Sequence, residues 1–278
     1  MTKAIATLSK TLEIVNENGL KVQKKFGQNF LIDANIVDKI AASSSDKQHL
    51  TIEIGPGIGS LTQMLSRHAR NVISYEIDPQ LIPVLAKNFE GVDNIQIIHQ
   101  DFLEVDLNAA AYKDEEINVC ANLPYYVTTP ILFKLFESPL KIMKITVMIQ
   151  KEVADRFKAQ VGGEDYNALS VIVNYLYDVK VVSQVPASVF YPRPRVDSTV
   201  ISFVPKIERN QEFEERFFKL VKQAFKMRRK TLWNNLKEVY GNEELEMMYE
   251  KLNISKTIRA QEIDLPLFKQ IYEVLNER

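Results

Sequence analysis

The fold is decided by the stretch Leu50-Thr51-Ile52-Glu53-Ile54-Gly55-Pro56-Gly57-Ile58-Gly59. Its first half is rich in β-branched residues and predicts a buried strand, and its second half is a turn with three glycines. A helical pattern follows over residues 60–69. A strand, a glycine turn and a helix form the first unit of a doubly wound sheet, in which glycine lets the backbone approach a ligand. We therefore predict an α/β fold with a Rossmann-like sheet.

The next predicted strand, residues 72–75, ends at Glu76. An acidic residue at that place can accept hydrogen bonds from both hydroxyls of a ribose, which suits a nicotinamide enzyme as well as a methyltransferase. The spacing Gly55-x-Gly57-x-Gly59 differs from the pyrophosphate-binding pattern, in which the third glycine stands three residues after the second. The turn therefore favours a nucleoside ligand without phosphates.

The motif Asn122-Leu123-Pro124-Tyr125-Tyr126 ends the fourth predicted strand, residues 117–121. Proline lacks an N–H donor and leaves the carbonyl groups around it free to accept. Asn122 adds a side-chain oxygen and Tyr125 a ring face, so the motif suits a planar amine that needs two acceptors and a stacking partner. The other strands are predicted at residues 95–98, 145–149, 180–185 and 199–204.

Two segments leave a structural and a functional interpretation open. Asp101 follows the strand at residues 95–98, where it would either cap a turn or accept a hydrogen bond from an adenine amino group. The segment KKFGQNFL, residues 24–31, is either an arm that packs its aromatic rings on the domain or a flap over a ligand. In the second case Gln28 and Asn29 would donate hydrogen bonds to the polar end of that ligand.

Basic residues gather in two places although the whole chain has a formal net charge of -1. Alternating prolines hold the loop at residues 189–198 extended; the loop projects the ring of Phe190, and its Arg193 and Arg195 can contact phosphates. A helix predicted over residues 213–240 carries a basic cluster that consists of Lys219, Lys222, Lys226, Arg228, Arg229 and Lys230. Such a cluster is either a solvated helix face or part of a nucleic-acid surface.

Length and composition predict a folded protein of two domains, residues 1–205 and residues 206–278, the second small and helical. The single cysteine, Cys120, excludes an internal disulfide, and the three histidines have no metal-ligand spacing, so we predict no metal. The sequence contains no run of eighteen apolar residues and no signal peptide. We therefore predict a cytoplasmic protein that does not associate with a membrane.

Six motifs in order resemble one family. The stretches FGQNFL at 26–31, EIGPG at 53–57, NLPYY at 122–126, QKEVADR at 150–156, FYPRPRVDS at 190–198 and RRKTL at 228–232 are similar to those of small-subunit ribosomal RNA adenine N6,N6-dimethyltransferases. The resemblance implies a Rossmann-like methyltransferase sheet and S-adenosylmethionine as cofactor. It further implies that the partner is ribosomal RNA in an immature small subunit, with two adjacent adenosines dimethylated near the 3′ end by a monomeric enzyme.

The resemblance also assigns roles to residues. Its cofactor positions are Asn29, Leu31, Gly55, Glu76, Asp101 and Asn122, with Glu76 at the ribose and Asp101 at the adenine amine. Tyr125 and Phe190 match the pair of rings that sandwich the target adenine in the related large-subunit enzymes. The expected catalytic set is thus Asn122, Leu123, Tyr125 and Phe190. The Asn122 side chain and the Leu123 carbonyl can accept hydrogen bonds from the two N–H groups of the N6 amine, and the two rings hold the base.

Three positions depart from the family pattern, Asn167, Gln261 and Asp264, and they leave the cofactor site untouched. Three alternatives remain at this point. They are a large-subunit ribosomal RNA adenine methyltransferase that confers macrolide resistance, a non-catalytic checkpoint factor of small-subunit assembly, and a nicotinamide oxidoreductase, which the glycine spacing disfavours.

Overall fold

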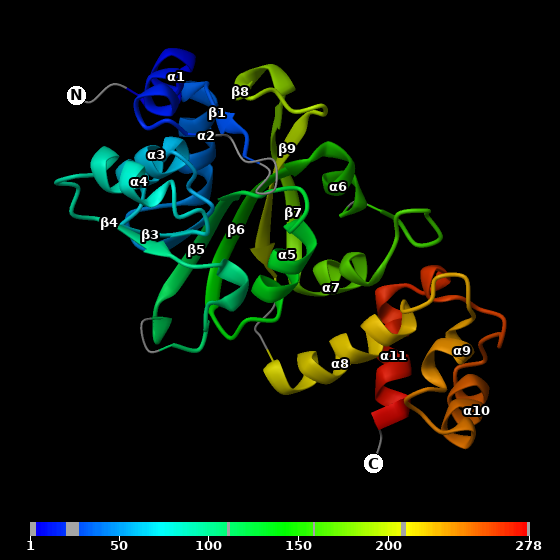
Figure 1. Cartoon of the computed structure of the whole chain (residues 1–278). Helices are drawn as coiled ribbons and strands as arrows, with labels where there is room; N and C mark the ends of the chain where they lie inside the picture. The colour runs from blue at the N-terminus through cyan, green and yellow to red at the C-terminus, as the bar shows by residue number, and fades with distance from the viewer. Residues whose placement is uncertain (1–3, 21–27, 110–111, 158, 207–209, 277–278) are drawn as a thin grey trace. The chain divides into compact units, whose positions relative to one another are not determined.

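The computed structural model describes residues 4–20, 28–109, 112–157, 159–206 and 210–276 (Figure 1). The chain forms two compact units. The first consists of Met1–Ala154 with Val179–Pro205, and the second of Asp155–Asp178 with Lys206–Arg278. The helical segment before Asp178 therefore groups with the C-terminal residues. The limits of two independently folding domains, 1–205 and 206–278, stay a prediction.

A seven-stranded sheet forms the centre of the first unit. Its strands stand in the order β4-β3-β2-β5-β6-β9-β7. Neighbours from β4 to β6 run parallel, and β9 is antiparallel to β6. The strands are β2 (Leu50–Ile54), β3 (Asn71–Glu76), β4 (Ile95–His99), β5 (Glu116–Asn122), β6 (Lys141–Gln150), β7 (Tyr177–Val185) and β9 (Ser198–Pro205). This arrangement confirms the predicted α/β class, and each strand overlaps its predicted range.

Strand order reverses beside β2. The chain adds β3 and β4 on one side of β2 and then crosses to β5 and β6 on the other side. Ile54 and Ala121 are register partners, so the carboxyl ends of β2 and β5 meet at one edge of the sheet. Ligands of doubly wound sheets bind at such a reversal, outside the carboxyl ends of the strands.

Helices cover both faces of this sheet. Side chains of α2 (Ala34–Ser44) and α3 (Ser60–His68) share a buried cluster with Cys120, Met148 and Val200 from three strands. Phe136, the last residue of α5 (Thr128–Phe136), packs its ring 5.3 Å from that of Phe203 on β9. Because side chains alternate along a strand, Val200 and Phe203 point to opposite faces. The shorter helices of this part are α1 (Leu8–Glu17), α4 (Ile82–Asn88) and α6 (Lys151–Arg156).

The second unit is helical. Its helices are α7 (Ala168–Leu176), α8 (Gln211–Ala224), α9 (Leu232–Leu236), α10 (Asn242–Lys251) and α11 (Leu265–Asn276). The prediction of one helix over residues 213–240 is wrong, because α8 ends at Ala224. Asn235 stabilises the break: its Nδ2 donates to the carbonyl of Ala224 at 2.7 Å, and its Oδ1 accepts from the amide of Met227 at 3.2 Å.

The three departures from the family pattern have local structural roles in the second unit. Asn167 lies at φ -153° and caps α7, since its Oδ1 accepts from the amide of Leu169 at 2.9 Å. Asp264 accepts from the amide of Leu267 at 2.9 Å, at the start of α11. The carbonyl of Gln261 accepts from the amide of Gly162 at 2.7 Å. Asparagine and aspartate both serve well as helix caps, so these substitutions fit the helices that they begin.

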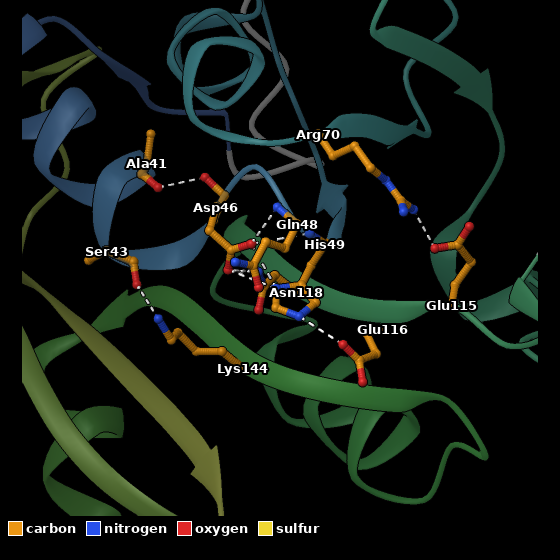
Figure 2. A network of polar contacts seen from close by, with 11 residues as sticks. Ala41, Ser43, Asp46, Gln48, His49, Arg70, Glu115, Glu116, Asn118 and Lys144 are labelled. Atoms are coloured by element: carbon orange, nitrogen blue, oxygen red, sulfur yellow. Dashed lines mark hydrogen bonds and ion pairs between the residues drawn. The ribbon is translucent and has the colours of Figure 1, made fainter.

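A network of polar contacts joins the amino-terminal ends of β2, β3 and β5 (Figure 2). The imidazole of His49 lies between two carboxylates, with Nδ1 2.7 Å from Asp46 Oδ1 and Nε2 3.0 Å from Glu116 Oε2. The hydrogen bond to Asp46 is the main cause that raises the pKa of His49, against its partial burial. Burial opposes ionisation of Asp46, but hydrogen bonds, led by the one from His49, lower its pKa to about 2. Both ring nitrogens face acceptors, which favours the imidazolium.

We expect His49→Gln to destabilise the protein more at pH 5.5 than at pH 8.5. A group whose folded pKa is raised contributes stability below its unfolded pKa and loses it as pH rises through the folded value. Because the partner carboxylates are nearly half exposed, the pH-dependent part should be about 1 kcal/mol. Urea unfolding at both pH values measures it, with His99→Gln, on the exposed end of β4, as the control. An equal loss at both pH values would contradict the prediction.

Candidate active site

A pocket opens at the carboxyl ends of β2, β3 and β5, where the strand order reverses. It encloses about 680 Å³ of empty space, part of which is open to solvent. Its lining comes from the arm at residues 28–31, the glycine turn, the start of α3, the end of β3 and the NLPYY motif. The lining residues are Gln28, Asn29, Phe30, Leu31, Gly55, Pro56, Gly57, Ile58, Ser60, Leu61, Glu76, Ile77, Leu81, Asn122, Pro124 and Tyr126. Five of the six expected cofactor positions are therefore brought together.

The glycine turn leaves room for a ligand beside the backbone. Gly55 has φ +70°, and a Cβ added there would have no atom within 4 Å. A side chain at Gly55 would thus occupy the pocket and not the core. Gly59 at the other end of the turn is required for packing, because an added Cβ would lie 2.6 Å from the ring of Phe89. The two glycines serve different purposes, open space at Gly55 and close packing at Gly59.

Glu76 is held rigidly at the end of β3 and is only 4% exposed. Its Oε2 accepts from the amide of Gly57 at 3.0 Å and its Oε1 from the amide of Asp78 at 2.8 Å. Burial raises the pKa of Glu76, to which the charge of Asp78 adds, while backbone hydrogen bonds from Asp78, Gly57 and Ile77 oppose the shift. Each carboxylate oxygen has further acceptor capacity, so the group can bind the hydroxyls of a ribose.

The arm at residues 28–31 is tied to three other segments. β1 (Phe30–Leu31) pairs antiparallel with β8 (Phe190–Tyr191) in a small second sheet, with Leu31 opposite Phe190. Ser60 Oγ donates to the carbonyl of Leu31 at 3.2 Å. Gln28 Nε2 donates to Asp78 Oδ2 at 2.7 Å. The arm thus lines the pocket through Gln28 to Leu31, and the start of the predicted arm, Lys24 to Gly27, lies outside the described residues.

Asn122 lies at the tip of β5 with its amide group oriented by the arm. Its Nδ2 donates to the carbonyl of Asn29 at 3.2 Å. This bond directs the NH₂ group toward the arm and leaves the side-chain oxygen as an acceptor in the pocket wall. A partly exposed acceptor beside a buried carboxylate and an open glycine turn fits a nucleoside ligand next to an amine substrate.

Comparison with known proteins shows which family the chain and its pocket belong to. A family model described as ribosomal RNA adenine dimethylase matches residues 19–277. The chain belongs to the ribosomal RNA adenine dimethylase family. It is 42% identical over 283 positions to ribosomal RNA small subunit methyltransferase A of Streptococcus gordonii, with 98% of each chain covered. The protein of the same name from Staphylococcus aureus is also 42% identical and covers 98% of this chain and 95% of its own.

Solved structures agree with the family assignment. A dimethyladenosine transferase from Plasmodium falciparum is 27% identical, with a TM-score of 0.70 over 87% of this chain and 95% of that one. The 23S ribosomal RNA methyltransferase ErmE is 26% identical, with a TM-score of 0.64 over 89% of this chain and 99% of that one. Membership of the ribosomal RNA adenine dimethylase family confirms the predicted fold, the enzyme class and the use of S-adenosylmethionine. It leaves the role of each residue as a prediction.

Four of the predicted residues of the dimethylase site lie outside the pocket lining. Asp101 uses Oδ1 to accept from the amide of Leu103 at 2.8 Å, which is the capping alternative. Leu123 is buried, and its amide donates to the carbonyl of Met148 at 3.1 Å. Tyr125 is half-buried, with its hydroxyl 3.4 Å from Ser198 Oγ. Phe190 is only 3% exposed in the core cluster, so stacking on a base would require its loop to move.

Other pocket residues were not among the predicted site residues. Ser60, Ile77 and Tyr126 are the most informative of them, because each directly follows, or lies in, a motif that the sequence identified. Ile77 follows Glu76 and is 38% exposed, and Tyr126 is the last residue of NLPYY and is 56% exposed. Their positions directly after or within these motifs were the signal in the sequence that could have found them.

No group of three or more His, Cys, Asp or Glu side chains that could hold a metal occurs among the described residues. In the same part of the chain, none of the helices combines the length and apolar character that a membrane span requires.

Proposed function

We propose that the chain transfers methyl groups from S-adenosylmethionine to N6 of two adjacent adenosines near the 3′ end of small-subunit ribosomal RNA, dimethylating each during assembly of the subunit. The observation that carries the proposal is the position of Asn122 in one pocket with Glu76 and Gly55. The relatives at 42% identity, which are named for the small subunit, support the choice of substrate. We further propose that the enzyme works as a cytoplasmic monomer on an immature subunit, where its substrate is found.

The cofactor positions fit their proposed ligand. Glu76 would hold the ribose, Gly55 would let the backbone lie against the cofactor, and Asn29 and Leu31 would close over it. Asp101 would accept from the adenine amine through the oxygen that does not cap Leu103. S-adenosylmethionine supplies a methyl group bound to a positively charged sulfur.

The chemical task of the protein is to prepare the target nitrogen. The N6 amine of adenine is a poor nucleophile, because its lone pair is delocalised into the ring. The Asn122 oxygen and the Leu123 carbonyl would accept hydrogen bonds from the two N–H groups of the amine. These bonds would favour a pyramidal nitrogen whose lone pair points at the methyl group of the cofactor. The same oxygens stabilise the positive charge that develops there. Tyr125 and Phe190 would hold the ring by stacking, worth about 1–3 kcal/mol for each base contact.

Exposed basic residues in each unit are the proposed contacts of the RNA backbone. The first unit offers Arg193 and Arg195, and the second offers Arg229 and Lys230. Several members of the predicted cluster have structural partners. Lys219 Nζ lies 2.7 Å from Glu215 Oε1, Lys226 Nζ lies 2.5 Å from Glu238 Oε2, and Arg228 donates to the carbonyl of Tyr166 at 2.8 Å. The predicted contacts Lys24 and Lys25 lie outside the described residues.

We expect the double substitution Arg193→Ala with Arg195→Ala to weaken RNA binding and to reduce its dependence on salt. Each phosphate contact that is lost should lower the slope of log Kd against log salt by about 1. Filter binding to a small-subunit RNA fragment over a salt series measures the slope. Lys39→Ala, on the exposed side of α2, is the control and should leave it unchanged. An unaltered slope in the double variant would remove this loop from the RNA surface.

The proposed function is tested by mapping methyl groups on ribosomal RNA. Small and large ribosomal subunits from cells that lack the protein are each incubated with the purified enzyme and S-adenosylmethionine labelled in its methyl group, and the RNA is analysed by mass spectrometry. Label on two adjacent adenosines near the 3′ end is expected. Label on large-subunit RNA would favour the macrolide-resistance activity. Normal assembly with the inactive Asn122→Ala protein would favour the checkpoint role.

A further inference from the structure

The NLPYY motif carries a second tyrosine whose ring lies in the pocket. Pro124 to Val127 form a hydrogen-bonded turn, in which the amide of Val127 donates to the carbonyl of Pro124 at 3.2 Å. The hydroxyl of Thr128 donates to the same carbonyl at 3.1 Å and anchors the turn to the start of α5. Tyr125 and Tyr126 occupy the two corner positions of this turn.

The two rings have different surroundings. Tyr125 is half-buried, and its hydroxyl lies 3.4 Å from Ser198 on β9. Tyr126 is 56% exposed and lines the same pocket as Glu76, Ile77 and Asn122. A tyrosine so exposed at the mouth of a pocket contributes little to the core, and a planar ligand would cover its ring.

The electrostatic surroundings of Tyr126 indicate which end of the pocket it faces. Partial burial is the first cause that raises the pKa of Tyr126, and the negative charges of Asp101 and Glu76 are the second and third. These are the two carboxylates proposed for the adenine amine and the ribose. Tyr126 also lies with Glu76 in the lining of the pocket, so both observations place it near the proposed ribose position. Ile77, the other exposed apolar residue of the lining, follows Glu76 directly.

We propose that Tyr126 is a cofactor-binding residue whose ring covers the adenosine end of S-adenosylmethionine, in the pocket wall that it shares with Glu76. The inference rests on the proposed function and on the proposed cofactor roles of Glu76 and Asp101. An aromatic face binds a purine by stacking, and a hydroxyl can donate to a carboxylate or to the bound nucleoside. The adenosine would then be held along its edges by the acids and on one face by Tyr126.

Isothermal titration with S-adenosylhomocysteine and with adenosine alone tests this assignment. Tyr126→Ala should raise the Kd of both ligands about tenfold, within the range expected for loss of one stacking contact. Tyr126→Phe, which keeps the ring, should stay within about twofold of the unmodified protein. Steady-state kinetics should show a raised KM for S-adenosylmethionine in Tyr126→Ala and a nearly unchanged kcat. Met143→Ala, an exposed apolar residue near the amino-terminal end of β6, is the control.

Several results would overturn the assignment. A Kd within twofold of the unmodified protein in Tyr126→Ala, with or without a lower rate on RNA, would exclude the ring from the cofactor site. Equal weakening in the Ala and Phe variants would exclude stacking. Failure of the unmodified protein to bind S-adenosylhomocysteine would instead refute the proposed function, so the two failures are distinguishable. Because Tyr126 is exposed, both variants should fold, and circular dichroism verifies this.

Discussion

Replacement of Asn122 by alanine is expected to lower kcat for adenosine methylation about 10²–10³-fold, while S-adenosylhomocysteine still binds. The side-chain oxygen is the acceptor that would fix the amine hydrogens of the target, and this contact strengthens as positive charge develops on nitrogen. Alanine also removes the hydrogen bond to the carbonyl of Asn29, so a small loss of cofactor affinity accompanies the loss of rate. Single-turnover transfer of a labelled methyl group separates the two effects.

Asn122→Asp is the matched variant for this prediction. Aspartate keeps an oxygen that can accept from the amine but loses the NH₂ group that donates to Asn29. If the acceptor is what matters, the Asp variant should be faster than the Ala variant while sharing its looser arm. Full activity of Asn122→Ala, or equal rates in both variants with normal cofactor affinity, would refute the acceptor role.

Glu76→Gln is expected to weaken the binding of S-adenosylhomocysteine about 10- to 100-fold. Glutamine keeps only one acceptor oxygen, and its NH₂ group is a donor, so it cannot accept from both Gly57 and Asp78. One buried amide therefore loses its partner, and the charge-assisted bonds to the ribose are lost as well. Titration calorimetry measures the change. Glu90→Gln, an exposed acid beyond α4, is the control.

The pH dependence of binding gives this second prediction a separate test. The carboxylate form of Glu76 is the acceptor, and its pKa is raised above the ordinary value by burial. Cofactor affinity of the unmodified protein should therefore fall as pH decreases through that raised pKa. The Gln variant, which has no group to titrate there, should lack this step. A parallel fall in both proteins would assign the dependence to another group.

The sequence was sufficient for the sheet and for most of the cofactor pocket. The β-branched run at Leu50–Ile54 predicted its strand because β2 is buried on both faces, and the turn at Gly55 identified the edge where the ligand site lies. Glu76 and Asn122 were found because both stand at the carboxyl ends of parallel strands. The carboxyl ends of parallel strands lie at the same edge of the sheet whatever the strand order, so the local sequence pattern was enough to place both residues near the ligand site.

Other features depend on contacts that no local pattern contains. The break between α8 and α9 is stabilised by Asn235, whose partners precede it by about ten residues in a stretch that reads as a helix. The ring of Phe190 is buried because β8 pairs with β1, which is distant in the sequence. Tyr126 was not assigned a role because its place in the pocket depends on the turn that begins at Pro124. The sequence alone does not show that the two neighbouring tyrosines have different surroundings.

The pairing of β1 with β8 has a consequence for how two methyl groups reach one nitrogen. The wall that would enclose the cofactor and the segment that carries Phe190 share main-chain hydrogen bonds, including one from the amide of Ile32 to the carbonyl of Val189 at 2.9 Å. If the used cofactor leaves past residues 28–31, the neighbouring segment loses its support at the same moment. Exchange of cofactor would then release the half-modified adenosine, so we expect a distributive reaction in which monomethylated RNA accumulates before the dimethylated product.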